Sequence, residues 1–109
     1  MYKIYIDTTE RFENKVILEK LEQNNSTVEL LEVDAIQGNI DIVDSIQKLL
    51  VRNSLDLLAI KEFVPNRGPG SFTGVKIGVT IANVLNWVLE IKSQEALAVP
   101  DYGKQPNIT

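Results

Sequence analysis

A glycine-rich stretch between two apolar segments is the part of this sequence best suited to chemistry. Residues 68–74 read Gly-Pro-Gly-Ser-Phe-Thr-Gly, with three glycines and two hydroxyl side chains. They follow an apolar run at 57–64 and precede a longer apolar-periodic run at 75–89. Small residues leave the backbone accessible, and the N–H groups at a helix start can bind an anion. The stretch is therefore a candidate phosphate-binding loop.

A second polar group follows the first expected strand. Asp7 and Thr8 stand where a strand over residues 2–7 ends, so they could contact a nucleotide or phosphate together with Gly70, Ser71 and Thr73. Asp7 could equally accept hydrogen bonds from its own turn, as in an Asx turn. These two interpretations place the same carboxylate in a ligand site or in a purely structural turn.

The spacing of the loop departs from that of a Walker phosphate loop. Gly74 is followed by Val75-Lys76 and not by Lys with Ser or Thr. Three interpretations therefore remain for the loop: a phosphate cradle, a sharp structural turn into a helix, and a contact surface for a partner.

Composition excludes several classes of function. The chain has 109 residues, 44% of them hydrophobic, which predicts one globular domain with its own core. Eleven basic and fifteen acidic residues give a net charge of −4 without a basic cluster, which argues against gripping nucleic acid by its phosphates. Cysteine and histidine are both absent, so thiol chemistry and histidine-based acid–base chemistry are excluded. Without an 18-residue apolar run or a signal peptide, we expect a cytoplasmic protein that does not contact a membrane.

Apolar residues alternate over residues 2–7, which predicts the first strand. Extended candidates follow at 14–21 and 27–34, separated by a polar turn at 23–26. Three antiparallel strands in a row are the economical interpretation. The apolar run at 57–64 predicts a fourth strand, in the centre of the sheet.

The period changes to that of a helix after residue 39. The apolar stripe of this first helix consists of Ile42, Val43, Ile46, Leu49 and Leu50. Asn39 or Asp41 is its candidate cap, and Asn53 its candidate end.

A second helix is expected from about residue 72 to 89, with Ser71 as its N-cap. Gly74, Gly78 and Ala82 recur every four residues and give this helix one narrow face of small residues. Glycine inside a helix costs about 0.5–1 kcal/mol relative to alanine, so Gly78 indicates close approach of another element. That element is either this domain's own sheet and first helix, or a helix of another chain. Trp87 lies on a different face and is either a rim contact or a core residue.

The expected order is therefore β-β-β-α-β-α. The fold class is α/β, a mixed sheet with both helices on one face. One lobe over residues 1–98 is followed by a loose tail at 99–109.

Three stretches resemble the TsaB (YeaZ) family. Ile6-Asp7-Thr8-Thr9 resembles the family's opening IDTS, and residues 68–79, GPGSFTGVKIGV, resemble its GPGSFTGLRIG signature almost residue for residue. Residues 93–98 resemble a weaker SLEALA element. The resemblance implies an actin-like, ribonuclease H-like N-terminal lobe. It also implies a part in making threonylcarbamoyladenosine beside the tRNA anticodon.

The resemblance further implies a non-catalytic subunit that docks on a TsaD-like catalytic subunit through its two helices. The implied partner interface comprises Ile42, Val43, Ile46, Leu50, Gly74, Gly78 and Ala82. ATP and metal would be held by the partner enzyme, and this chain would carry no cofactor. A TsaE-like ATPase is a further implied partner, and tRNA would be contacted only indirectly. Self-association of two copies of the chain through the same helices is a further possibility. The alternative is a nucleotide-binding or nucleotide-hydrolysing actin-like enzyme that uses the Asp7 turn and the Gly-rich loop.

The sequence also departs from the family pattern. Family members usually carry a second, similar lobe, and these residues contain only one. The His-Ser-Glu run common at the first helix is replaced by Gly38-Asn39-Ile40-Asp41. The strand that normally precedes SLEALA is reduced to residues 89–92.

Overall fold

The computed structural model describes residues 1–10, 13–21, 27–37, 42–92 and 96–101. The expected turn at 23–26, the candidate caps Asn39 and Asp41 and the first half of the 93–98 element lie outside the described residues.

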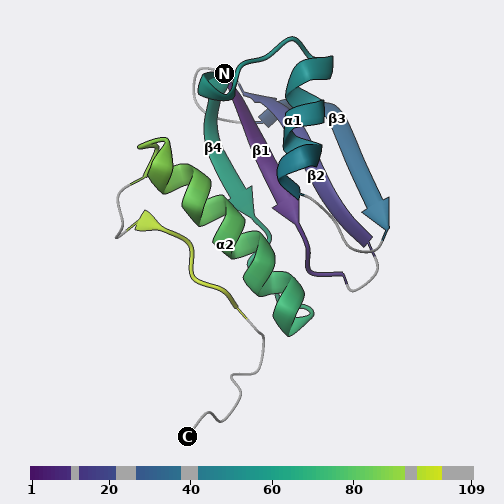
Figure 1. Ribbon diagram of the computed structural model, residues 1–109, viewed down its shortest axis with the longest axis vertical. Helices are drawn as coiled ribbons and strands as arrows, with labels where there is room; N and C mark the ends of the chain where they lie inside the picture. Colours follow the sequence, from purple (N-terminus) through teal and green to yellow (C-terminus); the bar gives the residue numbers. More distant parts are fainter. Residues whose placement is uncertain (11–12, 22–26, 38–41, 93–95, 102–109) are drawn as a thin grey trace, which may run out of the picture.

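Four strands form one mixed sheet (Figure 1). They are β1 (Tyr2–Asp7), β2 (Glu13–Leu21), β3 (Thr27–Gln37) and β4 (Ile60–Pro65). Their order is β3-β2-β1-β4, with β1 antiparallel to β2 and parallel to β4. The three antiparallel strands in a row are confirmed. The central position expected for the fourth strand is wrong, because β4 forms one edge of the sheet among the described strands.

The fourth strand also begins later than its apolar run. Leu57–Ala59 form a short 3-10 turn, and β4 starts only at Ile60. The turn forms because the carboxylate of Asp56 accepts a hydrogen bond from the Leu58 N–H at 2.9 Å. A local side-chain cap therefore overrides the apolar run that favoured a strand.

The two helices, α1 (Ile42–Arg52) and α2 (Phe72–Val88), pack on one face of the sheet (Figure 1). Between them and the sheet lies the core, in which Ile4 and Leu18 of the strands meet Leu49 of α1 and Ala82 of α2. Each of these four residues is fully buried. The residues that alternate with these along the strands lie on the other face of the sheet, away from the helices. On that face Lys3 of β1 forms an ion pair with Glu19 of β2 at 3.4 Å.

The C-terminal end of α1 is fixed to β3 through one acidic side chain. Glu32 accepts from the Arg52 Nε at 3.2 Å and from the Asn53 Nδ2 at 2.7 Å. Asn53 also donates to the carbonyl of Leu49 at 2.7 Å, which occupies one of the last free acceptors of the helix. The expected end of the first helix at Asn53 is confirmed to within one residue.

Candidate functional site

The carboxylate of Asp7 is used by its own turn. Asp7 Oδ1 accepts hydrogen bonds from the backbone N–H of Thr9 at 3.0 Å and from its hydroxyl at 2.7 Å. Thr8 and Thr9 are themselves buried. This geometry is the Asx turn that the sequence offered as the structural interpretation of Asp7.

Two opposing effects set the pKa of Asp7. Partial burial raises it, but hydrogen bonds from Thr9 and Asn66 and the charge of Lys15 outweigh burial and lower the pKa below its ordinary value. The Asp7 carboxylate is therefore ionised at neutral pH. For the neighbouring Tyr5 phenol, burial is the main cause of a raised pKa, and the charges of Asp7 and Glu19 add to it.

The Gly-rich loop closes directly onto this turn. The Ser71 N–H donates to the carbonyl of Thr9 at 3.0 Å, and the Ser71 hydroxyl accepts from the Gly74 N–H at 3.3 Å. The second bond confirms Ser71 as the N-cap of α2. The Thr8 hydroxyl donates to the carbonyl of Gly74. The hydroxyls of Thr8 and Ser71 thus bond within the protein itself.

Three glycines are required where the loop and α2 meet the Thr8-Thr9 turn. A Cβ added to Gly70 would lie within 3.0 Å of Thr9, and one added to Gly74 or Gly78 would lie within 3.0 Å of Thr8. Close packing against the end of β1 therefore explains these glycines without a ligand. Asp7, Thr8, Gly70 and Ser71 are brought together, whereas Thr73 lies exposed in the first turn of α2.

The small-residue face of α2 points into the domain. Gly78 and Ala82 are buried, and the added Cβ of Gly78 would also contact Ile6 at 3.7 Å. Of the two elements that could approach Gly78, the structure places the domain's own β1 there.

The apolar stripe of α1 is likewise largely internal. Ile42, Ile46 and Leu50 are buried in the core, while Val43 is 54% exposed. Five of the seven residues implied as a partner interface are therefore buried in this fold: Ile42, Ile46, Leu50, Gly78 and Ala82. Gly74 is partly buried, and only Val43 is exposed. The sequence pattern could not separate the core side of each helix from its outer side, because both helices carry exposed apolar residues as well as buried ones, such as Val43 on α1 and Val84 on α2.

An apolar groove lies on the outer side of this core, between α1, the 3-10 turn and α2. It is lined by Val43, Ile46, Gln47, Leu50, Val51, Leu55, Asp56, Leu57 and Leu85. Exposed valines continue the apolar surface on both helices, with Val51 71% exposed on α1 and Val84 51% exposed on α2. This outer face, which includes Val43, Ile46 and Leu50 of the stripe expected from the sequence, is an apolar surface that the two helices expose.

Trp87 is a surface residue, 59% exposed, beside Val88, Glu90 and Lys92. The core position considered for it from the sequence is wrong. The rim contact stays a prediction.

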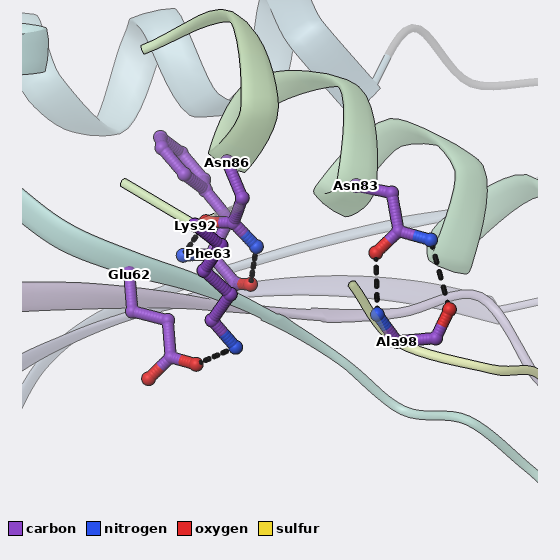
Figure 2. Close-up of polar contacts among 6 residues, drawn as sticks. All are labelled: Glu62, Phe63, Asn83, Asn86, Lys92 and Ala98. Carbon is purple, nitrogen blue, oxygen red and sulfur yellow. Dashed lines mark hydrogen bonds and ion pairs between the residues drawn. The ribbon is translucent and has the colours of Figure 1, made fainter. Parts of the chain in front are cut away.

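Two asparagines of α2 have structural roles that sequence reasoning missed (Figure 2). Each uses its carboxamide to bind both backbone groups of one residue, Asn83 those of Ala98 and Asn86 those of Phe63. The signal was available in the sequence, because asparagine is a poor helix former and here two stand one turn apart in an apolar helix.

Within the described residues, no group of three or more Asp or Glu side chains is placed to hold a metal ion. Nor does any helix in that part of the chain have the length and apolar character needed to cross a membrane.

The sheet order, the two helices on one face and the Gly-rich turn closed on the end of β1 define an α/β lobe of the actin-like, ribonuclease H-like class. The sequence model of the TsaD family, described as tRNA N6-adenosine threonylcarbamoyltransferase, matches residues 37–95, which is more than half of the chain. The chain belongs to this family, and the likeness to TsaB (YeaZ) expected from its signature motifs is confirmed.

Two curated proteins and a solved structure are also similar to this chain. The uncharacterized protein MG208 of Mycoplasma genitalium is 33% identical over 99 residues, which cover 90% of this chain and 48% of that protein. The tRNA threonylcarbamoyladenosine biosynthesis protein TsaB of Bacillus subtilis is 53% identical over 32 residues, 29% of this chain and 14% of that one. The structure of YeaZ from Pseudomonas aeruginosa superposes with a TM-score of 0.61 at 22% identity, over 82% of this chain and 40% of YeaZ. The matched part of this chain thus spans 48% of the MG208 protein and 40% of YeaZ, which is half of their length or less.

Proposed function

We propose that this chain is a non-catalytic subunit in tRNA threonylcarbamoyladenosine biosynthesis that docks on a TsaD-like catalytic subunit. Membership of the TsaD family and likeness to a protein named for this pathway support the assignment of the process. The catalytic subunit would hold ATP and metal. A TsaE-like ATPase and tRNA would bind to the complex, and tRNA would not contact this chain directly.

The main support for a non-catalytic role is that the protein's own residues fill the candidate phosphate site. The Thr8-Thr9 turn occupies the space beside Gly70, Gly74 and Gly78, and the hydroxyls of Thr8 and Ser71 already bond within the protein. A phosphate that used these hydroxyls would have to displace these contacts. The loop is therefore better suited to be a rigid turn that sets the direction of α2 than to bind a nucleotide.

The outer face of α1 and α2 is the docking surface in this proposal. The groove is lined by apolar side chains together with Gln47 and Asp56, and its lining residues Val43 and Val51 are 54% and 71% exposed. An apolar groove of this kind accepts the apolar face of a partner helix. This surface replaces the buried residues Gly78 and Ala82 as the place of contact.

Native mass spectrometry with the cognate TsaD-like protein tests the docking. Val43→Lys on α1 and Leu30→Lys on β3 form a matched pair, because the two side chains are 54% and 55% exposed. Burying a lysine in the contact weakens the complex by at least about tenfold. We expect that loss for Val43→Lys only. Equal affinities for both variants, or no complex with the unmodified chain at micromolar concentration, would contradict the proposal.

The alternative, a nucleotide-binding enzyme that uses Asp7, Thr8, Gly70, Ser71 and Thr73, makes the opposite prediction. Calorimetry with ATP and magnesium separates the two functions, because the subunit proposed here gives no binding heat. Binding that is lost in Thr73→Ala, a change at an exposed position of the loop, would favour the enzyme. A homodimer through the same helices would appear in the mass spectrum of the chain alone and would be competed by the TsaD-like protein.

A further inference from the structure

The segment 96–101, called the strap here, runs beside α2 (Figure 1). Its anchor is Asn83, as Figure 2 shows. The Asn83 Nδ2 donates to the carbonyl of Ala98 at 2.9 Å, and the Ala98 N–H donates to the Asn83 Oδ1 at 2.8 Å. One side chain therefore holds the strap by both polar groups of a single residue.

A second attachment joins the strap to the segment that leads into the Gly-rich loop. The Asp101 N–H donates to the carbonyl of Arg67 at 2.6 Å. The N–H of the same peptide group, that of Gly68, donates to the Asn66 Oδ1 at 3.1 Å. The peptide group between Arg67 and Gly68 is therefore held at both ends, by the strap on one side and by Asn66 on the other.

Direct packing accompanies this hydrogen bond. Gly68 has a φ of +98°, and an added Cβ would lie within 3.0 Å of the carbonyl oxygen of Asp101. Only glycine takes this conformation readily and also leaves room for the strap. The strap thus lies against the loop backbone itself.

The contacts continue from the loop to the end of β1. The Asn66 Nδ2 donates to the Thr9 hydroxyl at 3.4 Å, and that hydroxyl donates to Asp7 Oδ1 at 2.7 Å. A connected series of hydrogen bonds thus runs from Asp101 of the strap to the carboxylate of Asp7. Connected polar groups of this kind hold one another in a single geometry.

We propose that residues 96–101 are a conformational strap, that Asn83 latches it to α2, and that the latched strap holds the Gly-rich loop and the Asp7 turn in their closed arrangement. Release of the strap removes the outer support of the Arg67–Gly68 peptide group, while the inner contact of Ser71 with Thr9 remains. The loop then opens locally without unfolding of the sheet. This inference does not depend on the docking proposed above.

Amide hydrogen exchange measured by NMR on the full chain tests the strap. Asn83→Ala removes the latch and favours the helix, so the variant folds. Thr80→Ala, at an exposed position one turn earlier on α2, is the matched control. In Asn83→Ala we expect the Ala98 amide to exchange about tenfold faster or more, and the Asp101 and Gly68 amides to exchange at least about threefold faster. The Phe63 amide, bonded to Asn86, keeps its rate.

A second variant tests the link to Asp7. Asp101→Pro removes the N–H that binds the Arg67 carbonyl and leaves the Asn83 latch in place. We expect faster exchange at Gly68 with unchanged protection at Ala98, and a rise of the pKa of Asp7 toward its ordinary value. Unchanged Gly68 exchange in both variants would overturn the proposal. So would equal acceleration at Phe63 in Asn83→Ala, because Asn83 would then support the whole helix rather than the strap.

Discussion

The Asn86 carboxamide of α2 pairs with both backbone groups of Phe63 on β4 (Figure 2). Asn86 Oδ1 accepts from the Phe63 N–H at 3.0 Å, and Asn86 Nδ2 donates to the Phe63 carbonyl at 2.8 Å. Both residues are buried, with 2% and 0% of their surfaces exposed. A side chain thus takes the hydrogen bonds that a neighbouring strand would make at this edge of the sheet.

Replacing Asn86 by leucine should therefore be strongly destabilising. The Phe63 N–H and carbonyl would both stay buried without a partner, at a cost of about 2–5 kcal/mol in the free energy of unfolding. Urea unfolding followed by circular dichroism measures the change. Thr80→Ala serves as the control, with an expected effect of about 0.5 kcal/mol or less. A loss below about 1 kcal/mol for Asn86→Leu would show that the edge of β4 is satisfied in another way.

Gly78→Ala should destabilise the domain although alanine is the better helix former. The new methyl group would lie within 3.0 Å of the Thr8 hydroxyl, and overpacking of about 1–3 kcal/mol exceeds the helix gain of about 1 kcal/mol. A double-mutant cycle with Thr8→Ala isolates this contact, because the second change removes the hydroxyl that clashes. We expect the double variant to be more stable than the sum of the single effects predicts. Strict additivity would mean that Gly78 is not packed on Thr8.

The pH dependence of stability should include a contribution from Asp7. Its pKa is lowered in the folded chain, so the stabilisation is complete above the unfolded pKa of about 3.9 and is lost as the pH falls through the lower folded value. Asp7→Asn should cost about 1 kcal/mol or less at pH 7, since the side chain is partly exposed and an amide oxygen can still accept. Urea unfolding from pH 7 to pH 2 should show this difference shrinking below about pH 4. A difference that stays constant over this range would speak against a lowered pKa.

Much of the backbone could be predicted from local patterns. Alternation gave β1, and Ser71 marked the start of α2, because a strand face and an N-cap are set by a few neighbouring residues. The signature at Gly68–Gly74 also indicated a turn at the right place. The contacts with Thr8 and Thr9, which lie about sixty residues away in the chain, support the interpretation as a structural turn, and local sequence could not reveal them.

What could not be predicted depends on tertiary packing. The apolar run at 57–64 suggested a strand in the centre of the sheet, but β4 lies at an edge. The edge position is possible because α2 covers β4 and Asn86 binds the free N–H of Phe63. The tail expected to begin at residue 99 is held as far as Asp101 by the Arg67 carbonyl, and residues 102–109 lie outside the described part of the chain. Single-sequence periodicity contains no information about such long-range pairs.

We expect this chain to support a TsaD-like enzyme without supplying catalytic groups. The most direct measurement is the rate of threonylcarbamoyladenosine formation on tRNA by the cognate TsaD-like protein, with its ATPase and substrates, in the presence of each variant of this chain. We expect the unmodified chain and Thr73→Ala to support the same rate, and Val43→Lys to lower the rate unless its concentration is raised to restore the complex. A rate that does not depend on this chain, or one abolished by Thr73→Ala while the complex stays intact, would contradict the proposed non-catalytic role.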